Sequence, residues 1–217
     1  MQTAAATRTE EHSLGVRDRP SVRSVPDCTE RKSATVLFVD VMGSMDLSGS
    51  IELEQWWSVI AVLYELMCDG VYRFDGWVGN FTGDGIKAVF EAGSPKKQAF
   101  SACRSALWLR DAIEGPAEDL RREHGLELSV RIGINSGEIV TGTIGDRYSR
   151  YYTASGYAVA LAKRVEGLAP AGCIYLTEHT ATFLGRPAAL RELGRFDVKG
   201  ARDRVCVFEL VGTGRAR

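Results

Sequence analysis

The sequence contains no apolar run near the roughly 18 residues that a membrane-spanning helix needs. Its first residues, MQTAAATRTEEHS, lack the apolar stretch of a secretory signal, so a cytoplasmic location is expected. Charge of one sign is not in excess either, because the formal net charge is −1 over 217 residues. A field that would attract nucleic acid or an anionic membrane is therefore not expected.

Cysteine is scarce and shows no pattern. The five cysteines lie far apart, and none forms a C-x-x-C or a Cys/His spacing. They are Cys28, Cys68, Cys103, Cys173 and Cys206. An odd number at such spacings argues against a disulfide framework and against a zinc site. Cys68 and Cys103 fall within helical apolar patterns, where a free cysteine is typically a small core residue.

The composition is typical of a globular domain. Hydrophobic residues make up 45% of the chain and charged residues 25%, as in soluble proteins with a single core. Residues 1–32 are polar, lack periodicity and contain Pro20 and Pro26, which predicts a flexible tail. The expected division is a tail at 1–32, one domain at 33–211 and a short C-terminal tail at 212–217.

Strand-like and helical patterns alternate along the domain. Strands are predicted at 34–41, 77–81, 86–90, 128–135, 138–144, 173–176, 191–198 and 204–211, and helices at 52–74, 94–113 and 155–168. Turn residues join the second and third strands at Thr82–Gly85, and the next pair at Ser136-Gly137. The β-α-β-β-α-β order predicts an α+β fold with a ferredoxin-like core and extra C-terminal elements.

Two carboxylates stand out in this pattern. Asp40 interrupts an apolar strand, where an unpaired charge is costly, and Asp84 lies in a turn between two glycines. The first strand of a ferredoxin-like fold runs beside the central hairpin, so the two carboxylates are expected to meet and bind a cation such as Mg²⁺. The alternative is that Asp84 only forms the turn and that Asp40 pairs with a basic residue.

Five segments, in order, resemble the catalytic domains of class III nucleotidyl cyclases. They are FVDVMGSM (Phe38–Met45), NFTGDGIKAVF (Asn80–Phe90), VRIGINSGEIVTGTIG (Val130–Gly145), TASGYAVALAKRVE (Thr153–Glu166) and FDVKGARDRVCVFEL (Phe196–Leu210). The resemblance covers approximately residues 33–211. It implies that an adenylate cyclase converts ATP, with GTP as the second candidate, to the 3′,5′-cyclic monophosphate and pyrophosphate. Attack of the ribose 3′-hydroxyl on the α-phosphate would be assisted by two Mg²⁺ or Mn²⁺ ions.

The same resemblance implies a homodimer with shared active sites. One subunit would contribute Asp40 and Asp84 as metal ligands and Arg131 as a phosphate ligand. Its partner would contribute Asn80 and Thr153 to the base, Arg164 to the α-phosphate as a catalytic residue, and Lys199 to the terminal phosphates. The backbone N–H groups of Met42, Gly43, Ser44 and Met45 would cradle phosphate oxygens. The plainer interpretation of Arg164 and Lys199 is that both are solvated surface residues.

Two base-reading positions depart from the family pattern. Asn80 stands where the family usually has Lys for ATP or Glu for GTP, and Thr153 where it often has Asp or a small residue such as Cys. An amide and a hydroxyl each donate and accept hydrogen bonds, so they suit either base. The expectation is ATP with weak discrimination against GTP.

A third departure concerns the rate. Ala160 stands where the family has an Asn that stabilises the transition state, and loss of such a bond slows other enzymes roughly 10²–10³-fold. The departure allows a slow enzyme, or one in which Tyr157 or another group substitutes. The favoured interpretation of Tyr157 itself is an aromatic residue packed at the interface. The alternative is a degenerate cyclase domain that binds nucleotide or dimerises to regulate a partner. A diguanylate cyclase is disfavoured because the sequence contains no Gly-Gly-Asp/Glu-Glu-Phe turn.

Overall fold

The computed structural model describes residues 29–146, 148–185 and 188–213. Its strands are β1 (Glu30–Val41), β2 (Trp77–Phe81), β3 (Ile86–Phe90), β4 (Val130–Gly145), β5 (Arg150–Ser155), β6 (Ile174–Thr177), β7 (Ala188–Phe196) and β8 (Val205–Thr213). Its helices are α1 (Ser44–Ser50), α2 (Leu53–Tyr72), α3 (Pro95–Ala112), α4 (Glu114–His124), α5 (Tyr157–Glu166) and α6 (Glu178–Leu184).

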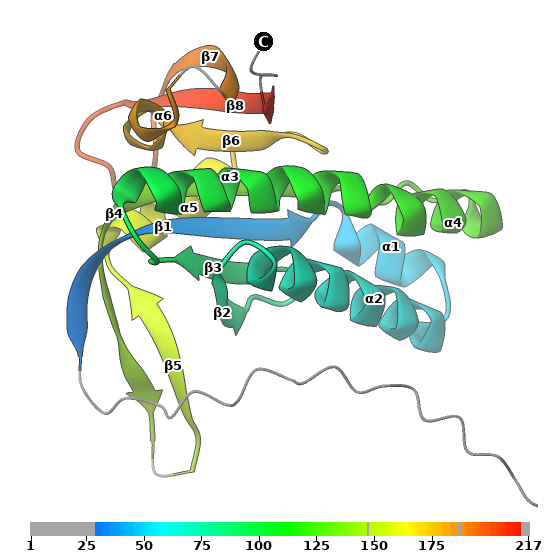
Figure 1. Ribbon diagram of the computed structural model, residues 1–217. Helices are drawn as coiled ribbons and strands as arrows, with labels where there is room; N and C mark the ends of the chain where they lie inside the picture. Colours follow the sequence, from blue (N-terminus) through cyan, green and yellow to red (C-terminus); the bar gives the residue numbers. More distant parts are fainter. Residues whose placement is uncertain (1–28, 147, 186–187, 214–217) are drawn as a thin grey trace, which may run out of the picture.

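The strands form one mixed sheet in the order β2-β3-β1-β4-β6-β8-β7, with β5 paired to β4 alone (Figure 1). The central strand β1 runs antiparallel to β3 on one side and to β4 on the other. The order β2-β3-β1-β4 is that of a ferredoxin-like core, and β6 to β8 extend it. The predicted α+β fold is confirmed.

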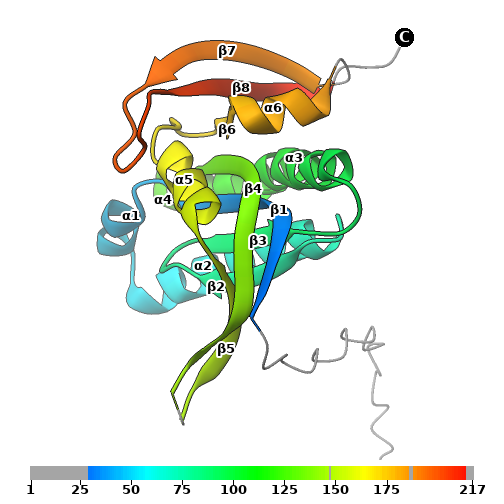
Figure 2. The same ribbon diagram turned by 90° about the vertical axis from the view of Figure 1, so that its left-hand side faces the viewer.

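The sheet is covered on both faces. Leu37 and Val39 of β1 pack against α2 and α3, whereas Val36 and Phe38 lie in a separate cluster with α5. Figures 1 and 2 show α2 and α3 on one side of the sheet and α5 on the other. Burial on both faces explains why β1 reads as a nearly continuous apolar run instead of an alternating one.

The predicted hairpin at Ser136-Gly137 is wrong. Strand β4 continues through these residues because it stays paired with β1, with Ser136 opposite Thr35 and Gly137 opposite Ala34. The Ser136 hydroxyl is buried and lies 2.8 Å from that of Thr35, so the side chain is satisfied within the sheet. Beyond the edge of β1, β4 turns back into β5, and the two strands form a projecting arm (Figure 2).

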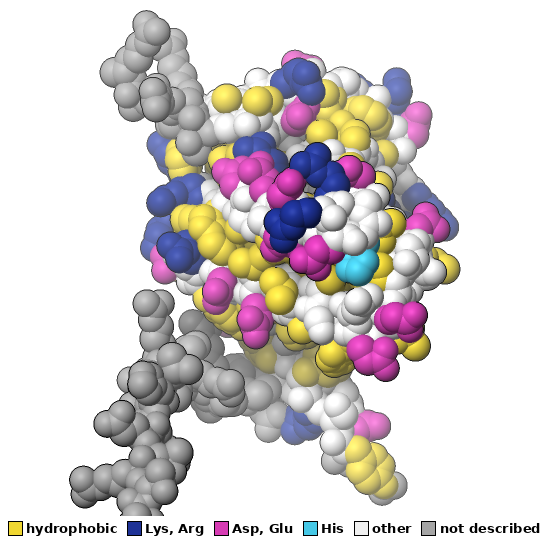
Figure 3. Space-filling model, turned by 90° about the vertical axis from the view of Figure 1, so that its right-hand side faces the viewer, with side chains coloured by type: hydrophobic (Ala, Val, Ile, Leu, Met, Phe, Trp, Pro, Cys, Tyr) yellow, Lys and Arg dark blue, Asp and Glu magenta, His cyan; other side chains and the backbone are white. Residues whose placement is uncertain are grey.

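The patterns also missed several short elements, namely α1, α4, β5 and α6. The polar stretch around Pro116 is helical in the structure, since α4 has acidic residues early, basic residues late and ion pairs one turn apart. On the side of the molecule where α4 ends, basic, acidic and apolar side chains are interspersed (Figure 3).

Strand β1 starts at Glu30, three residues before the predicted start of the domain at residue 33, and the predicted division of the chain stays a prediction. Residues 1–28 of the expected N-terminal tail, and 214–217 of the expected C-terminal tail, lie outside the described residues. Strand β8 extends to Thr213, beyond the predicted boundary. Among the described residues, none of the helices is both long and apolar enough to span a membrane.

Candidate active site

The site is centred on Asp40, near the end of the buried strand β1. The register places Arg131 of β4 directly opposite, and its guanidinium donates a 2.9 Å hydrogen bond to Asp40 Oδ2. The ammonium of Lys163 approaches Asp40 Oδ1 from α5 at 3.5 Å. Asp40 therefore does pair with basic residues, as the alternative interpretation expected, and its predicted metal-binding role remains a prediction.

A second carboxylate completes a network around Arg131. Glu166, at the end of α5, is fully buried and contacts the Arg131 guanidinium. Its other oxygen lies 2.7 Å from Lys163 Nζ. Burial raises the pKa of Glu166, against the opposing effect of the Lys163 and Arg131 charges. The negative charges of Asp40 and Glu166 are thus matched by the positive charges of Arg131 and Lys163 in a partly desolvated cluster.

Neither Lys163 nor Glu166 was singled out from the sequence. The available signal was their spacing of three residues in the last turn of a predicted helix, which places both on one face. That spacing is common on solvated helices, so it does not reveal which face meets the sheet.

Asp84 lies in the β2–β3 turn beside the end of β1. The following residue, Gly85, is buried so tightly that a Cβ there would lie 2.1 Å from the Val39 carbonyl oxygen and 2.9 Å from Asp40 Oδ1. Only glycine allows the turn to come this close to Asp40. The Tyr64 hydroxyl donates to the Gly83 carbonyl and ties the turn to α2. The expected approach of the first strand to the hairpin is confirmed.

These residues fit a divalent cation. Asp40 at the end of β1 and Asp84 in the β2–β3 turn supply the hard oxygen ligands that Mg²⁺ and Mn²⁺ prefer. Within the described ranges there is no group of three or more His, Cys, Asp or Glu side chains suited to a metal. Further ligands would have to come from backbone, water or substrate phosphate, as is usual for Mg²⁺ sites that act on nucleotides.

The predicted phosphate cradle follows β1 directly. Gly43 adopts a left-handed conformation (φ 67°) and precedes the first turn of α1. The Met42 amide already donates a 2.9 Å hydrogen bond to the Ser129 carbonyl oxygen. This leaves the backbone amides of Gly43, Ser44 and Met45 for the predicted role, without that of Met42.

The predicted base-reading residues meet a lysine that the sequence analysis did not consider. Thr153 is buried, and its hydroxyl accepts a 2.7 Å hydrogen bond from Lys87 Nζ. Lys87 lies in β3 directly opposite Asn80 of β2. The available signal was a lysine inside the apolar strand IKAVF. Lys87 therefore contacts Thr153 and lies opposite Asn80 in the neighbouring strand.

Arg164 and Lys199 stand apart from these clusters. Arg164 is exposed on α5, where its neighbour Lys163, one position earlier, is the residue that reaches Asp40. Lys199 is exposed in the β7–β8 connection, beside a hollow of about 420 Å³ that it shares with Arg202 and Arg204. Ala160 is exposed one turn before Arg164. One chain thus pairs Asp40 with Arg131, places the turn that carries Asp84 against Asp40, and leaves Arg164 and Lys199 exposed.

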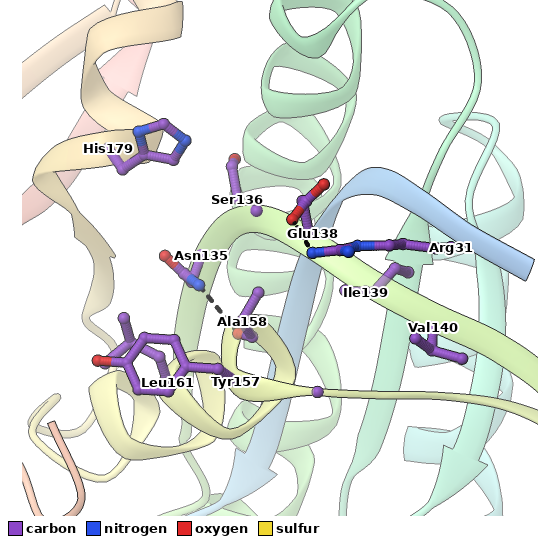
Figure 4. A pocket seen from close by; sticks show the side chains of 12 residues that line it. Arg31, Asn135, Ser136, Glu138, Ile139, Val140, Tyr157, Ala158, Leu161 and His179 are labelled. Carbon is purple, nitrogen blue, oxygen red and sulfur yellow. Dashed lines mark hydrogen bonds and ion pairs between the residues drawn. The ribbon is translucent and has the colours of Figure 1, made fainter.

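An open cavity of about 620 Å³ lies elsewhere, at the N-terminal end of α5 (Figure 4). Its polar lining includes the exposed ion pair of Arg31 with Glu138, together with Tyr157 and His179. None of the predicted site residues lines it. The cavity and the carboxylate site therefore lie at opposite ends of α5.

A ferredoxin-like sheet with an acid at the end of its first strand, a second acid in the adjacent turn and an arginine opposite is the arrangement expected of a nucleotidyl cyclase catalytic domain. The chain belongs to the adenylate and guanylate cyclase catalytic domain family, whose model matches residues 27–212.

Individual relatives agree with this assignment. Adenylate cyclase 1 of Rhizobium meliloti (strain 1021) is 28% identical over 190 residues, which are 86% of this chain and 28% of that protein. The adenylate cyclase of Anabaena cylindrica is 28% identical over 185 residues, which are 81% of this chain and 36% of that protein. The chain thus spans only about a third or less of the length of these relatives.

Solved structures match the fold over most of its length. The adenylyl cyclase CyaB from P. aeruginosa has a TM-score of 0.83 and 27% identity, with 86% of this chain and 97% of that chain covered. The guanylyl cyclase Cya2 has a TM-score of 0.78 and 26% identity, with 86% and 95% covered. One is an adenylyl and the other a guanylyl cyclase, so structural similarity alone does not select the base.

Proposed function

We propose that this domain is an adenylate cyclase that converts ATP to 3′,5′-cyclic AMP and pyrophosphate. The observation that carries the proposal is the approach of the Gly85 turn to Asp40, because it brings the turn that carries Asp84 against the strand end where Asp40 pairs with Arg131. In the reaction, the ribose 3′-oxygen bonds to the α-phosphorus and the bond to the β-phosphate oxygen breaks. The hydroxyl proton passes to water.

The residues of the carboxylate site hold and position the triphosphate. Two Mg²⁺ or Mn²⁺ ions held by Asp40 and Asp84 would supply positive charge beside the attacking oxygen and the leaving phosphates. Arg131 exchanges its hydrogen bond with Asp40 for one with a phosphate oxygen, and Glu166 keeps its guanidinium in place. Amides of Gly43 to Met45 orient phosphate oxygens at the start of α1.

The groups that face outward serve the site of a second subunit. Arg164 then stabilises the α-phosphate in the transition state and Lys199 contacts the terminal phosphates, in a head-to-tail homodimer. The projecting arm supports this arrangement because it exposes apolar side chains, as interaction surfaces do. These are Val140, Ile144, Tyr148 and Tyr151.

The test is a cyclase assay on purified protein with ATP or GTP, in Mg²⁺ and in Mn²⁺. We expect cyclic AMP from the native protein and at least a ~10²-fold lower rate from Asp84→Ala, because one of two metal carboxylates is lost. Asp119→Ala, which removes an exposed carboxylate on α4, is the control and should keep the native rate.

Ala160 makes one negative result decisive. If folded native protein forms no cyclic product from either nucleotide in either metal, the proposal is wrong. A domain that binds nucleotide or dimerises without turnover is then the correct description, since Ala160 lacks the polar group that transition-state stabilisation requires.

A further inference from the structure

Lys87 is a buried lysine on the same face of the sheet as the candidate site. The residue is only 7% exposed, and burial lowers the pKa of its ammonium. Its two partners are neutral, since Nζ donates to the Thr153 hydroxyl at 2.7 Å and to the Ala154 carbonyl oxygen at 2.8 Å. Lysine is almost never fully buried without a paired charge, so packing alone does not explain this residue.

The position of Lys87 is set by the sheet. It pairs with Phe38 of β1 on one side and with Asn80 of β2 on the other, and paired residues point to the same face. Its stem lies against Gly79, where a Cβ would come within 2.9 Å of Lys87 Cε. Gly79 and Asn80 also line a cavity of about 560 Å³ with Tyr151 and Tyr152, next to Thr153.

Three polar groups at this place have hydrogen-bonding capacity left. A lysine ammonium has three N–H donors, of which two are used by groups of the described residues. The Thr153 oxygen, which accepts from Lys87, retains its own hydrogen and one lone pair. Asn80 Oδ1 is buried and accepts no hydrogen bond from the described residues, while its amide nitrogen donates to the Phe81 carbonyl oxygen.

We propose that Lys87 is a base-recognition residue, whose ammonium donates to N1 of the adenine of ATP while Thr153 and Asn80 accept from the N6 amine. This inference rests on the proposed function. The adenine edge presents one acceptor and one donor, and the site offers a free ammonium N–H beside acceptor oxygens. Lys87 supplies from β3 the fixed positive donor that Asn80, its cross-strand neighbour, lacks.

Removing the ammonium tests the proposal by equilibrium binding. The ligands are 3′-deoxy-ATP, which lacks the attacking hydroxyl and cannot be cyclised, and its 1-deaza analogue, which lacks the N1 acceptor. For native protein, the analogue should bind about 10–100-fold more weakly, as expected for a hydrogen bond to a charged group. For Lys87→Met the two ligands should bind within about twofold of each other, because neither then receives the bond.

A matched control and a relocation variant sharpen the result. Lys97→Met removes an exposed lysine from α3 and should keep the native preference for the N1-containing ligand. The double variant Asn80→Lys/Lys87→Asn moves the ammonium across the hairpin on the same face, and should recover a preference of at least about tenfold. Binding of both ligands by Lys87→Met itself shows that this variant is folded.

The outcomes separate this inference from the proposed activity. If Lys87→Met weakens both ligands equally, or neither, Lys87 does not read N1 and this inference is overturned, whatever the cyclase assay gives. If neither ligand binds native protein, both proposals fail. Binding with the expected N1 preference, but without product from ATP, supports the role of Lys87 and overturns the cyclase activity alone.

Discussion

At the scale of the residue, the site consists of buried acidic side chains, each of which is paired with basic side chains. Asp40 and Glu166 share Arg131 and Lys163, so each buried acid contacts both bases. A buried charge left without its partner destabilises a protein by several kcal/mol. Asp40 and Glu166 are thus held by Arg131 and Lys163, with which a metal ion or phosphate bound here would have to exchange.

Lys87 differs because, among the described residues, its ammonium hydrogen-bonds to the neutral Thr153 hydroxyl and Ala154 carbonyl and not to an acid. Burial lowers its pKa in the folded protein, so the unfolded chain binds more protons between that pKa and the usual value near 10.5. The native protein therefore gains stability as pH rises through this window. At pH values below this window Lys87 is charged in both states, and burial of its ammonium opposes folding.

We expect Lys87→Met to be at least as stable as the native protein at pH 7. The difference in free energy of unfolding between variant and native should shrink between pH 7 and 11, by about 1.4 kcal/mol for each unit by which the pKa is lowered. Urea denaturation across this range measures it, with Lys97→Met as control. A difference that stays constant with pH would contradict the prediction.

At the scale of the element, α5 is positioned by one glycine of β4. Gly133 lies opposite Phe38 of β1 and beside Tyr175 of β6. A Cβ at this position would lie 2.2 Å from the backbone nitrogen of Glu166. The end of α5 therefore rests directly on the strand, which is how Glu166 reaches Arg131.

Gly133→Ala should separate these two elements. The added methyl group meets backbone, which cannot move aside as a flexible side chain does, so we expect a loss of about 1–3 kcal/mol in the free energy of unfolding. Cyclase activity should fall as well, because Glu166 no longer holds Arg131. Chemical denaturation and the cyclase assay measure the two effects.

Gly212→Ala in β8 provides the comparison, since nothing lies within 4 Å of a Cβ there. This variant should be as stable as native protein or up to about 1 kcal/mol more stable, because alanine loses less chain entropy than glycine. Equal stability of the Gly133→Ala and Gly212→Ala variants would show that α5 is not held as described.

The elements also show how far sequence patterns reach. The buried strand β1, the β2–β3 hairpin and helices α2 and α3 follow from periodicity and turn residues alone, close to their observed bounds. Continuity of β4 through Ser136-Gly137 does not, because pairing with β1 overrides a local turn signal. Asp40 and Asp84 are visible as charges in apolar or glycine-rich settings. Lys163 and Glu166 are not, since only the packing of α5 brings them to Asp40.

At the scale of the whole molecule, the arrangement of charged groups predicts complementation. If Arg164 serves the site of the other subunit, Asp84→Ala and Arg164→Ala should each be inactive alone and partly active when mixed. Random pairing makes half the dimers mixed, and each has one intact site, so recovery should approach about a quarter of the native activity.

The measurement is cyclic AMP formation after mixing the two variants at equal concentration and allowing subunits to exchange. Mixing Asp84→Ala with Asp40→Ala is the control, because both variants lack a carboxylate of the same half-site and no dimer regains it. Absence of recovery in the first mixture, from variants that still dimerise, would show that Arg164 does not act across the interface.

Strand β4 has a consequence for how such a domain is controlled. One unbroken run of backbone carries Arg131 near one end and the exposed arm at the other. At about 3.3 Å per residue, this strand is some 50 Å long. A loop at Ser136-Gly137 would have absorbed a shift of the arm, whereas a continuous strand transmits it. A module that moves the arm would therefore act along one strand on Arg131, the arginine proposed to bind phosphate.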